Sequence, residues 1–416
     1  MNFYLNKYGF QPPFIQSEPH PELEMVIVIP CYDEDNLITS LNALYQCEKP
    51  SSAVEVIVIV NAGKQTTERI KVKNINTYQA ALSWSSNLNT PTFHFHISIA
   101  EELPKKHAGV GLARKIGMDE AVDRFDQLDK DGVIVCFDAD ALCLPNYLQE
   151  IEKHFINHPK TPGCSIHYEH PVEGTEFEPA IYNGIINYEL HLRYYNQGLK
   201  YAGLPYAYHT VGSSMAVRSS AYQKQGGMNK RKAGEDFYFI HKIIALGGFT
   251  ELKTTAVLPS PRISDRVPFG TGKAIGDWIA EDKTVFETYA FESFELLKAF
   301  VNCIPRFRTD NIPSHNYGLA PDENDLIYGF LLEQKFQNAL DEIRLNSKTE
   351  AAFIKRFFRW FDAFKVLKFM HFLRDNGVKN QPVFQEVTKL LLRTNNTQIA
   401  IDEVVMLRFF RDLEKK

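Results

Sequence analysis

The sequence predicts an α/β protein in which a mostly parallel sheet carries helices on both faces and an all-helical C-terminal region follows. Strand-like apolar runs alternate with helix-like segments in the first part of the chain, which is the order of βαβ units. Several runs lack polar alternation, as do strands buried on both faces of a parallel sheet. From Ala274 onward the strand patterns stop and only helical periodicity continues.

The expected elements follow one another in a regular order. Residues 1–22, rich in proline and aromatic side chains, are expected to form an extended arm on the surface. The apolar runs predict four buried strands, at Met25–Ile29, Val54–Val60, Phe93–Ile99 and Gly132–Phe137. Helices are expected between them, near 37–44, 66–87 and 109–128.

Five more elements are expected after the fourth strand, and glycine pairs at 226–227 and 247–248 interrupt the chain among them. They are a helix at 145–158, a strand at Cys164–Tyr168, a helix at Pro179–Asn196, a strand at Val211–Val217 and a helix at Glu235–Leu246. We therefore expect an arm at 1–22, an α/β domain at 23–275 and a helical region at 276–416, with residues 304–324 as a linker between two of its helices.

Composition excludes several classes of protein. With 44% hydrophobic and 23% charged residues among 416, the chain is expected to be globular and soluble. A net charge of −5 gives no reason to expect a nucleic-acid partner. The N-terminal residues do not form a signal peptide, and no apolar window is long enough to cross a bilayer. The six scattered cysteines predict buried free thiols in a reducing cytoplasm rather than disulfides or a zinc site.

The fourth expected strand ends in two carboxylates, Asp138 and Asp140. In an extended segment, side chains at positions i and i+2 point the same way, so both acids can face one divalent cation, or one a metal and the other a ribose. Open α/β sheets bind ligands at this carboxyl edge. A solvated turn at the end of a strand would use the same residues, so the surrounding motifs decide between the two interpretations.

Four further polar segments occur in a fixed order around this pair. They are Pro30-Cys-Tyr32-Asp-Glu34, Asn61-Ala-Gly63, Gly109-Val-Gly111-Leu-Ala-Arg114, and Gly226-Gly227 followed by Gly234-Glu235-Asp236. With Asp138-Ala-Asp140, the set resembles the family 2 glycosyltransferases of the GT-A fold, a branch of the nucleotide-diphospho-sugar transferase superfamily. The resemblance covers about residues 24–275 and leaves the C-terminal third unexplained.

The resemblance implies a metal-dependent, inverting glycosyltransferase of the hexosyltransferase type (EC 2.4). It would use Mn²⁺ or Mg²⁺ and a nucleotide-diphosphate sugar, and its acceptor hydroxyl would lie on a glycan, a lipid-linked molecule or a small molecule. Asp140 would contact the metal, and Asp138 the metal or the ribose. Hard carboxylate oxygens suit either cation, which stabilises the charge that develops on the departing diphosphate.

Donor contacts are implied for the loop after the first strand, with Pro30 at its start, Tyr32 against the base and Glu34 near the ribose or base. Acids in this loop could equally cap the next helix. Asn61 stands where the family more often has a pair of aspartates, which leaves the identity of the base open. Arg114 could reach the diphosphate as a fork donor, or pair on the surface with Asp119 or Glu120.

The segment around the second glycine pair is expected to carry the chemistry. By resemblance Asp236 is the general base, while Glu235 and Gly227 contact the acceptor. An acid at a helix N-terminus is held ionised by the helix dipole and can accept the proton of an attacking hydroxyl. Local capping is the alternative use of such an acid.

The loop at 260–273 is basic and contains glycine, which suggests closure over the diphosphate through Arg262 and Arg266. The alternative is a solvated connection between domains. The loop contains no histidine, so it offers no third metal ligand of that type.

One helical segment of the C-terminal region, at 352–367, places an aromatic stripe opposite basic residues. The stripe predicts a packed core; the alternative is peripheral contact with the inner face of a membrane.

Two other functions compete with the transferase. Sugar-nucleotide nucleotidyltransferases need a glycine- and arginine-rich loop after the first strand, where this chain has Cys31-Tyr32-Asp33-Glu34. The second competing function is a non-catalytic GT-A-like domain, which would bind a glycan or nucleotide or act as a partner of another transferase. The altered segment at Asn61 gives this alternative some support.

Overall fold

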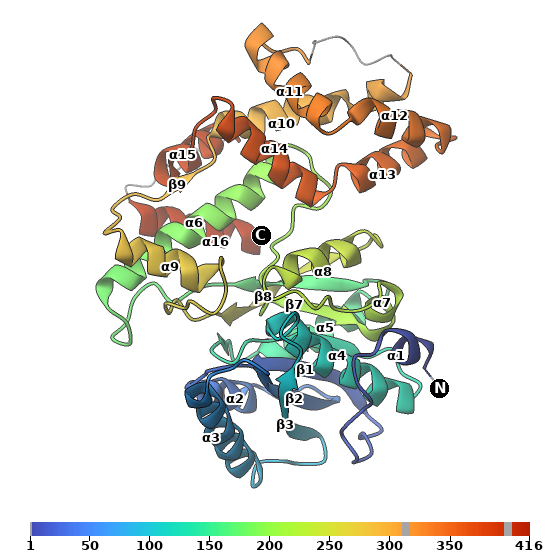
Figure 1. Cartoon of the computed structure of the whole chain (residues 1–416), viewed down its shortest axis with the longest axis vertical. Helices are drawn as coiled ribbons and strands as arrows, with labels where there is room; N and C mark the ends of the chain where they lie inside the picture. The colour runs from blue at the N-terminus through green and yellow to red at the C-terminus, as the bar shows by residue number, and fades with distance from the viewer. Residues whose placement is uncertain (1, 310–316, 395–401) are drawn as a thin grey trace. The chain divides into compact units, whose positions relative to one another are not determined.

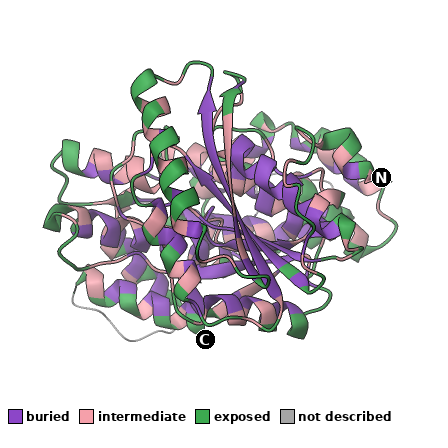
Figure 2. Ribbon diagram, turned by 90° about the horizontal axis from the view of Figure 1, so that it is seen from below, coloured by how far each residue is buried: buried purple, intermediate pink, exposed green. Residues whose placement is uncertain are grey.

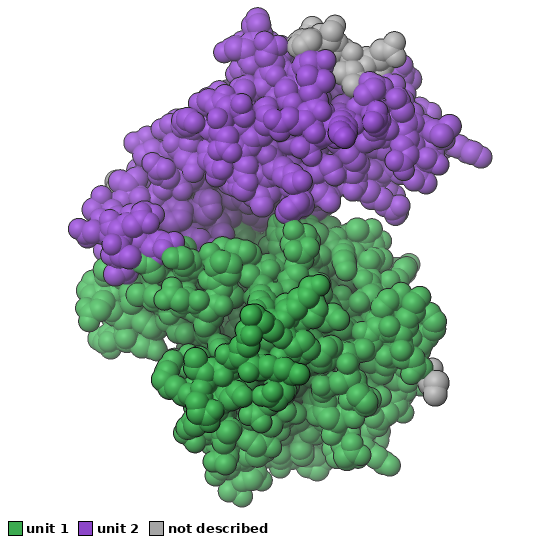
Figure 3. Space-filling model, viewed as in Figure 1, with its two compact units in different colours: residues 1–182, 209–276, 413–416 green, residues 183–208, 277–412 purple. Residues whose placement is uncertain are grey.

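The computed structural model describes residues 2–309, 317–394 and 402–416, and the chain divides into two compact units (Figure 1, Figure 3). Unit 1 comprises Met1–Tyr182, His209–Gly276 and Leu413–Lys416. Unit 2 comprises Asn183–Tyr208 and Asp277–Asp412. The units therefore do not follow the chain strictly. Residues 183–208, which lie inside the α/β part of the sequence, belong to unit 2, and the last four residues of the chain belong to unit 1.

Unit 1 is built on an eight-stranded, mostly parallel sheet surrounded by helices, as the sequence predicts. The strand order is β3-β2-β1-β4-β7-β6-β8-β5. The pairs β3–β2, β2–β1, β1–β4 and β6–β8 are parallel, whereas β7 runs antiparallel to both β4 and β6, and β5 antiparallel to β8. The strands are β1 (Leu23–Cys31), β2 (Ala53–Gly63), β3 (Phe93–Leu103), β4 (Val133–Cys136), β5 (Leu142–Cys143), β6 (Gly163–Tyr168), β7 (Met215–Arg218) and β8 (Thr250–Leu258).

The expected four strands and the helices between them are confirmed, with ends that differ by a few residues. The strand β8 was not expected, because its polar residues interrupt the apolar pattern that identifies the others. Burial explains why the first strands were easy to find: β2 is buried at every position, and Figure 2 shows the strands buried among helices with exposed outer faces. Unit 1 has the helices α1 (Phe3–Tyr8), α2 (Leu37–Gln46), α3 (Glu68–Ser85), α4 (Val110–Gln127), α5 (Tyr147–Asn157), α7 (Ser219–Lys224), α8 (Glu235–Ile244) and, in large part, α9 (Thr271–Ala280).

Helix α4 is unusual because it is buried along most of its length even though it carries many charges. It packs on β1, β2 and β4. Its buried charged residues all have partners; they are Arg114, Lys115, Asp119, Glu120 and Arg124. Buried charges are tolerated only when they are paired and hydrogen-bonded. The fold therefore depends on what reaches α4 from other segments.

The N-terminal arm supplies several of these partners. The Tyr4 hydroxyl donates to Asp119 at 2.7 Å, and the backbone N–H of Phe14 donates to Glu120 at 3.0 Å. Farther along, the guanidinium of Arg124 donates to the carbonyl of Ser17. The arm is thus held by charge-assisted hydrogen bonds at two successive turns of one helix.

Unit 2 is helical and has an aromatic core centred on Phe300. The rings of Phe307, Phe361 and Phe369 lie with their centroids 5.0–6.2 Å from that of Phe300. Beyond α6 (Pro179–Tyr201), the helices are α10 (Phe291–Cys303), α11 (Pro321–Glu333), α12 (Phe336–Leu345), α13 (Glu350–Trp360), α14 (Ala363–Asp375), α15 (Val383–Arg393) and α16 (Glu403–Lys415). A 3₁₀ turn (Ile304–Arg308) and the short strands β9 (Glu287–Thr288) and β10 (Gln381–Pro382) complete the unit. In the linker expected at 304–324, residues 310–316 lie outside the described part of the chain, as do residues 395–401 of the expected helical region.

Three rings of the aromatic stripe at 352–367 belong to this core, whereas the ring of Phe364 is 39% exposed. Phe353, Phe357 and Phe361 are fully buried within unit 2. Rings that already pack against protein are not available to insert into a bilayer, so the structure favours the core interpretation of the stripe. Among the described residues, no helix combines the length and apolar character needed to span a membrane.

Replacing Arg124 with alanine should destabilise the protein strongly. Arg124 Nε and Nη2 donate to the two carboxylate oxygens of Glu55 at 2.8 and 2.5 Å, and the variant leaves that buried carboxylate without its guanidinium. Breaking a buried pair in this way costs about 3–5 kcal/mol of unfolding free energy, measured by urea denaturation at neutral pH. Lys130→Ala, which removes the solvent-exposed pair with Glu24, should cost less than about 1 kcal/mol.

The cost of Arg124→Ala should also depend on pH. Burial alone would raise the pKa of Glu55, but hydrogen bonds from His96 and Arg124 outweigh it and lower that pKa from 4.5 to about 2. A depressed carboxyl pKa stabilises the fold above the unfolded value, and this contribution is lost as pH falls toward the folded value. The difference between native and variant should therefore shrink between about pH 4.5 and pH 2; a constant difference would contradict the role of the pair.

Candidate active site

The candidate site lies at the carboxyl edge of the sheet in unit 1. Strands β1, β2 and β4 end there, followed by residues 32–36, 64–67 and 138–140. Because β7 is antiparallel to β4, the segment that precedes it, Gly212–Ser214, reaches the same edge. Strand β8, parallel to β6, also ends at this edge and leads into the basic loop that carries Arg262 and Arg266. Topology alone therefore brings together four of the predicted segments and adds Gly212–Ser214, which was not predicted.

Arg114 joins two of the predicted acids. It lies near the start of α4, and its side chain is 2% exposed. One terminal nitrogen donates to Asp138 Oδ1 at 2.5 Å, and the other donates to Glu235. The two carboxylates raise its pKa in spite of burial, so the guanidinium stays charged. Arg114 thus lies behind the acids and holds them, rather than pairing with Asp119 or Glu120 on the surface.

Two glycines allow this close packing. A Cβ atom built on Gly212 would lie 2.6 Å from a terminal nitrogen of Arg114, so the backbone itself covers the guanidinium. A Cβ on Gly111 would lie 2.3 Å from the carbonyl oxygen of Arg231, in the loop that leads to α8. A larger residue at either position would push this backbone away from α4. The glycines therefore bring the start of α8 to Arg114.

Glu235 and Asp236 open helix α8. Glu235 is buried, and burial raises its pKa to about 7 although Arg114 opposes the shift. Asp236 is half-buried, accepts a hydrogen bond from the N–H of Phe237 at 2.7 Å, and also has a pKa raised by burial. A carboxyl group with a raised pKa beside a permanent cation is suited to accept and release a proton near neutrality.

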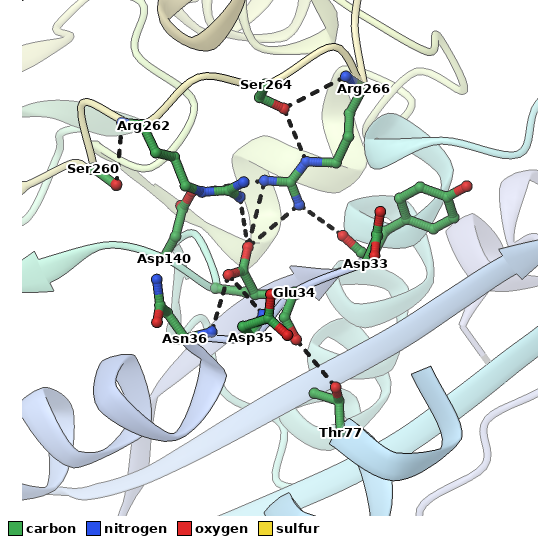
Figure 4. A network of polar contacts seen from close by, with 12 residues as sticks. Asp33, Glu34, Asp35, Asn36, Thr77, Asp140, Ser260, Arg262, Ser264 and Arg266 are labelled. Atoms are coloured by element: carbon green, nitrogen blue, oxygen red, sulfur yellow. Dashed lines mark hydrogen bonds and ion pairs between the residues drawn. The ribbon is translucent and has the colours of Figure 1, made fainter. Parts of the chain in front are cut away.

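A second group of charges closes around Glu34 (Figure 4). One oxygen of Glu34 accepts from the backbone N–H groups of Asp35 and Asn36, both at 3.0 Å, ahead of α2. Its other oxygen accepts from Arg262 at 2.5 Å and from Arg266 at 3.3 Å. The Glu34 carboxylate therefore accepts hydrogen bonds from two backbone N–H groups ahead of α2 and also binds the basic loop through Arg262 and Arg266.

Arg262 also binds Asp140, so one guanidinium bridges the two acids. Its Nε donates to Asp140 Oδ2 at 2.6 Å. Burial raises the pKa of Asp140 to about 6, while Arg262 opposes the shift and Asp138 and Glu34 add to it. Figure 4 shows Arg262 and Arg266 entering from one side and the acids from the other. The basic loop thus folds over the loop that follows β1 and is not a free connection between domains.

The fit of a divalent cation to these residues follows from the same contacts. Asp138 and Asp140 lie in a turn just after β4, not in an extended segment, because the N–H of Ala141 donates to the carbonyl of Asp138. They consequently have different partners, Arg114 and Arg262. In the described part of the chain, no three His, Cys, Asp or Glu side chains are arranged to hold a metal ion. Asp140 nevertheless offers hard oxygens at a place that already attracts a cation.

The remaining donor residues predicted from sequence lie around the loop after β1. Pro30 is inside β1 rather than at its end, and the carbonyl of Tyr32 accepts from Arg266 at 2.6 Å. Asn61 is buried at the end of β2, where its carbonyl accepts from the Asn74 side chain at 3.0 Å. Asn74 also accepts from the N–H of Asp33 and so joins the ends of β1 and β2.

Sequence reasoning missed Asn74, although one signal was present. It is a polar residue with a short side chain inside α3, a helix whose hydrophobic pattern is indistinct. Gly227, predicted to contact the acceptor, lies instead where a Cβ would overlap the Tyr4 hydroxyl, and its φ of +73° favours glycine. Packing of the arm accounts for this glycine, and acceptor contact at Gly227 stays a prediction.

Comparison with known families agrees with the geometry. Residues 26–226 match the model of glycosyl transferase family 2. The chain carries a glycosyl transferase family 2 domain. The matched segment contains every predicted donor residue up to Asp138, together with Asp140, and ends before Glu235 and the basic loop. No curated protein matches the chain.

Two solved structures are similar to the chain along most of its length. The crystal structure of S. aureus TarS 1-349 in complex with UDP-GlcNAc has 13% sequence identity and a TM-score of 0.40, and the alignment covers 92% of this chain and 95% of that one. Mannosyltransferase PcManGT from Pyrobaculum calidifontis, in complex with GDP-Man and Mn2+, has 14% identity and a TM-score of 0.35, with 100% and 94% covered.

Replacing Arg114 with glutamine should destabilise the family 2 domain through its carboxylates. The variant leaves Glu235 buried without a cation, at an expected cost of about 3–5 kcal/mol in unfolding free energy. Adding Glu235→Gln should recover part of this loss, because the uncompensated acid is then removed. Urea denaturation of both variants at about pH 8 measures the coupling. A double variant no more stable than Arg114→Gln would show that Arg114 does not act through Glu235.

Proposed function

We propose that the family 2 domain transfers a hexosyl group from a nucleotide-diphosphate sugar to an acceptor hydroxyl, with a divalent cation and with inversion. The observation that carries this proposal is the double contact of Arg114, which ties Asp138 of the donor motif to Glu235 at the start of α8. An acid pair able to move a proton is thereby fixed beside the acids expected to receive the donor. A binding domain has no need of this juxtaposition.

Asp138 and Asp140 would hold Mn²⁺ or Mg²⁺. Such a cation supplies charge stabilisation to the diphosphate leaving group. The support for this assignment is the chemistry of the two carboxylates and the affinity of Asp140 for a positive group, seen in its bond to Arg262.

Arg262 and Arg266 would transfer from acids to phosphates when the donor binds. Each of the two guanidinium groups now pairs with both Glu34 and Asp140. A diphosphate offers the same fork-shaped guanidinium group more negative charge and more acceptor oxygens than a carboxylate. Both arginines would then leave Asp140, so that donor binding and cation binding favour each other. Tyr32, Asn61 and Pro30 would shape the pocket for the nucleotide.

Asp236 would act as the general base, with Glu235 holding the acceptor. Attack by a hydroxyl from the face opposite the leaving group inverts the anomeric centre, and the base accepts the hydroxyl proton. The half-buried position of Asp236 and its raised pKa suit this role. Glu235, locked to Arg114, is better suited to positioning.

A reducing, cytoplasmic site of action is part of the proposal, and the six free cysteines support it. The acceptor classes are a glycan, a lipid-linked molecule and a small molecule. A non-catalytic nucleotide- or glycan-binding role is the second candidate, favoured by Asn61 in place of the family's aspartates.

A nucleotide panel should identify the donor class. We expect one of UDP, GDP, CDP, dTDP and ADP to raise the melting temperature in the presence of Mn²⁺, by the equivalent of about 2.7 kcal/mol at a hundredfold excess over Kd. Asp140→Ala should abolish the shift, whereas Asp35→Ala, which removes an exposed acid from the loop after β1, should retain it. Arg262→Ala should make Mn²⁺ alone more stabilising than it is for native protein. Absence of any nucleotide shift would refute the donor site.

Asp236→Asn separates the transferase from the non-catalytic alternative. With the identified nucleotide sugar and an acceptor panel, turnover should fall about 10²–10⁴-fold, because the proton acceptor is lost. The nucleotide shift should remain, which shows that the variant is folded. Unchanged turnover would exclude Asp236 as the base, and no turnover by native protein with any acceptor would favour the binding role.

A further inference from the structure

Two of the six cysteines lie against each other although they are distant in sequence. The Sγ atoms of Cys47 and Cys143 are 3.5 Å apart. Cys47 follows the last turn of α2, and Cys143 lies in β5. Cys47 is 4% exposed and Cys143 is half-buried, so the pair is close to the surface on one side. Neither residue has a role in the proposed transfer reaction.

The backbone around the pair is fixed by other contacts. The N–H of Glu48 donates to the carbonyl of Pro145 at 2.8 Å, and the side chain of Gln149 donates to the carbonyl of Lys49 at 3.2 Å. The Cys47 thiol also lies 3.7 Å from the carbonyl of Leu144. The two segments are therefore held in register before any covalent bond forms. Since an S–S bond is about 2.05 Å long, the sulfurs need to approach by only about 1.5 Å.

The other cysteines have a different environment. Cys31, Cys136 and Cys164 are fully buried in strands, and burial raises the pKa of each thiol, that of Cys136 to about 12. The hydrogen bond from Cys143 instead lowers the pKa of Cys47, with Lys49 contributing to the shift and burial opposing it. The same hydrogen bond, together with burial, raises the pKa of Cys143. Because the thiolate is the reactive form, Cys47 is the attacking sulfur, and its contact with Cys143 makes that residue its partner.

We propose that Cys47 and Cys143 form a covalent modification site, a dithiol that a hydroperoxide converts into an intramolecular disulfide. In the first step the Cys47 thiolate attacks a peroxide oxygen, the O–O bond breaks, and Cys47 becomes a sulfenic acid while the peroxide leaves as an alcohol or as water. In the second step the Cys143 sulfur gives up its proton and attacks the Cys47 sulfur, which releases water. The sulfur pair loses two electrons and the peroxide gains them.

The position of this site links it to two elements of the candidate active site. Helix α2 begins at Leu37, three residues after Glu34, and β5 begins two residues after Asp140. A disulfide would tie the far end of α2 to β5, the strand that pairs with β8 ahead of the basic loop. The expected effect is a protein with a higher melting temperature, because the cross-link closes a long loop of the unfolded chain.

The test treats the reduced full-length protein with hydrogen peroxide, blocks the remaining thiols, and maps peptides without reduction. We expect a peptide that joins Cys47 to Cys143, a fall from six titratable thiols to four, and reversal of both changes by dithiothreitol. The melting temperature should rise on oxidation and return on reduction. Cys143→Ser should remove the cross-link, whereas Cys303→Ser, matched in chemistry but placed in unit 2, should retain it.

Three results would overturn the inference. Six free thiols after treatment would show that the pair is not oxidisable. A cross-link that joins two chains, or involves Cys31, would show that proximity of Cys47 and Cys143 does not direct the chemistry. Oxidation to sulfinic acid at Cys47 in native protein, with no disulfide, would show that Cys143 cannot resolve the intermediate. Serine variants that keep native melting temperatures before oxidation show that such results do not arise from misfolding.

Discussion

The guanidinium of Arg114 is the constraint on which the candidate site depends. It is buried under the Gly212 backbone and carries a charge that must be balanced by Asp138 and Glu235. Asp138 follows the end of β4, and Glu235 lies at the start of α8. No strand pairing connects these two elements, so their contacts with Arg114 hold them at a fixed distance. Without the Arg114 guanidinium, the carboxylates of Asp138 and Glu235 would repel each other at the place where the proposed chemistry needs both.

A second charge balance, at Glu34, differs from the first in its exposure. Arg262 and Arg266 are partly open to solvent, and they share their acids with one another. These two arginines can exchange partners at a lower cost than Arg114, because they are partly solvated and because the buried Glu34 keeps its bonds from two backbone N–H groups. One arginine thus provides a fixed framework, while the other two provide the part that can respond to a ligand. The same chemical group serves both purposes because its burial differs.

The sequence predicted the parts of the fold that depend on local pattern. The apolar runs of β1, β2, β3 and β4 identify themselves because a strand buried on both faces needs no polar residue. Strand β8 could not be found in this way, since its Glu251, Lys253 and Thr254 face partly outward. Tertiary pairing, rather than its own periodicity, makes it a strand.

The site was predictable as a set of residues but not as a set of contacts. Asp138, Asp140 and Glu235 stand out by their place after strands or before a helix. Their partners do not, because Arg262 is 122 residues from Asp140 and Arg114 is 121 from Glu235. Pairing across such separations is decided by the path of the whole chain. The turn at Asp138–Asp140 was likewise hidden, since the letters of that segment fit an extended strand equally well.

Helix α4 has a mechanical consequence beyond its packing. Its 18 residues span about 27 Å as one rigid rod. Arg114 sits near one end of the rod, while Asp119, Glu120 and Arg124 fasten the N-terminal arm along the remainder. The arm therefore supports α4. A displacement of the arm would be transmitted along this helix to Arg114 and the two acids that Arg114 holds. Residues of the N-terminal arm, which are distant from the site in sequence, are therefore connected to it through one helix.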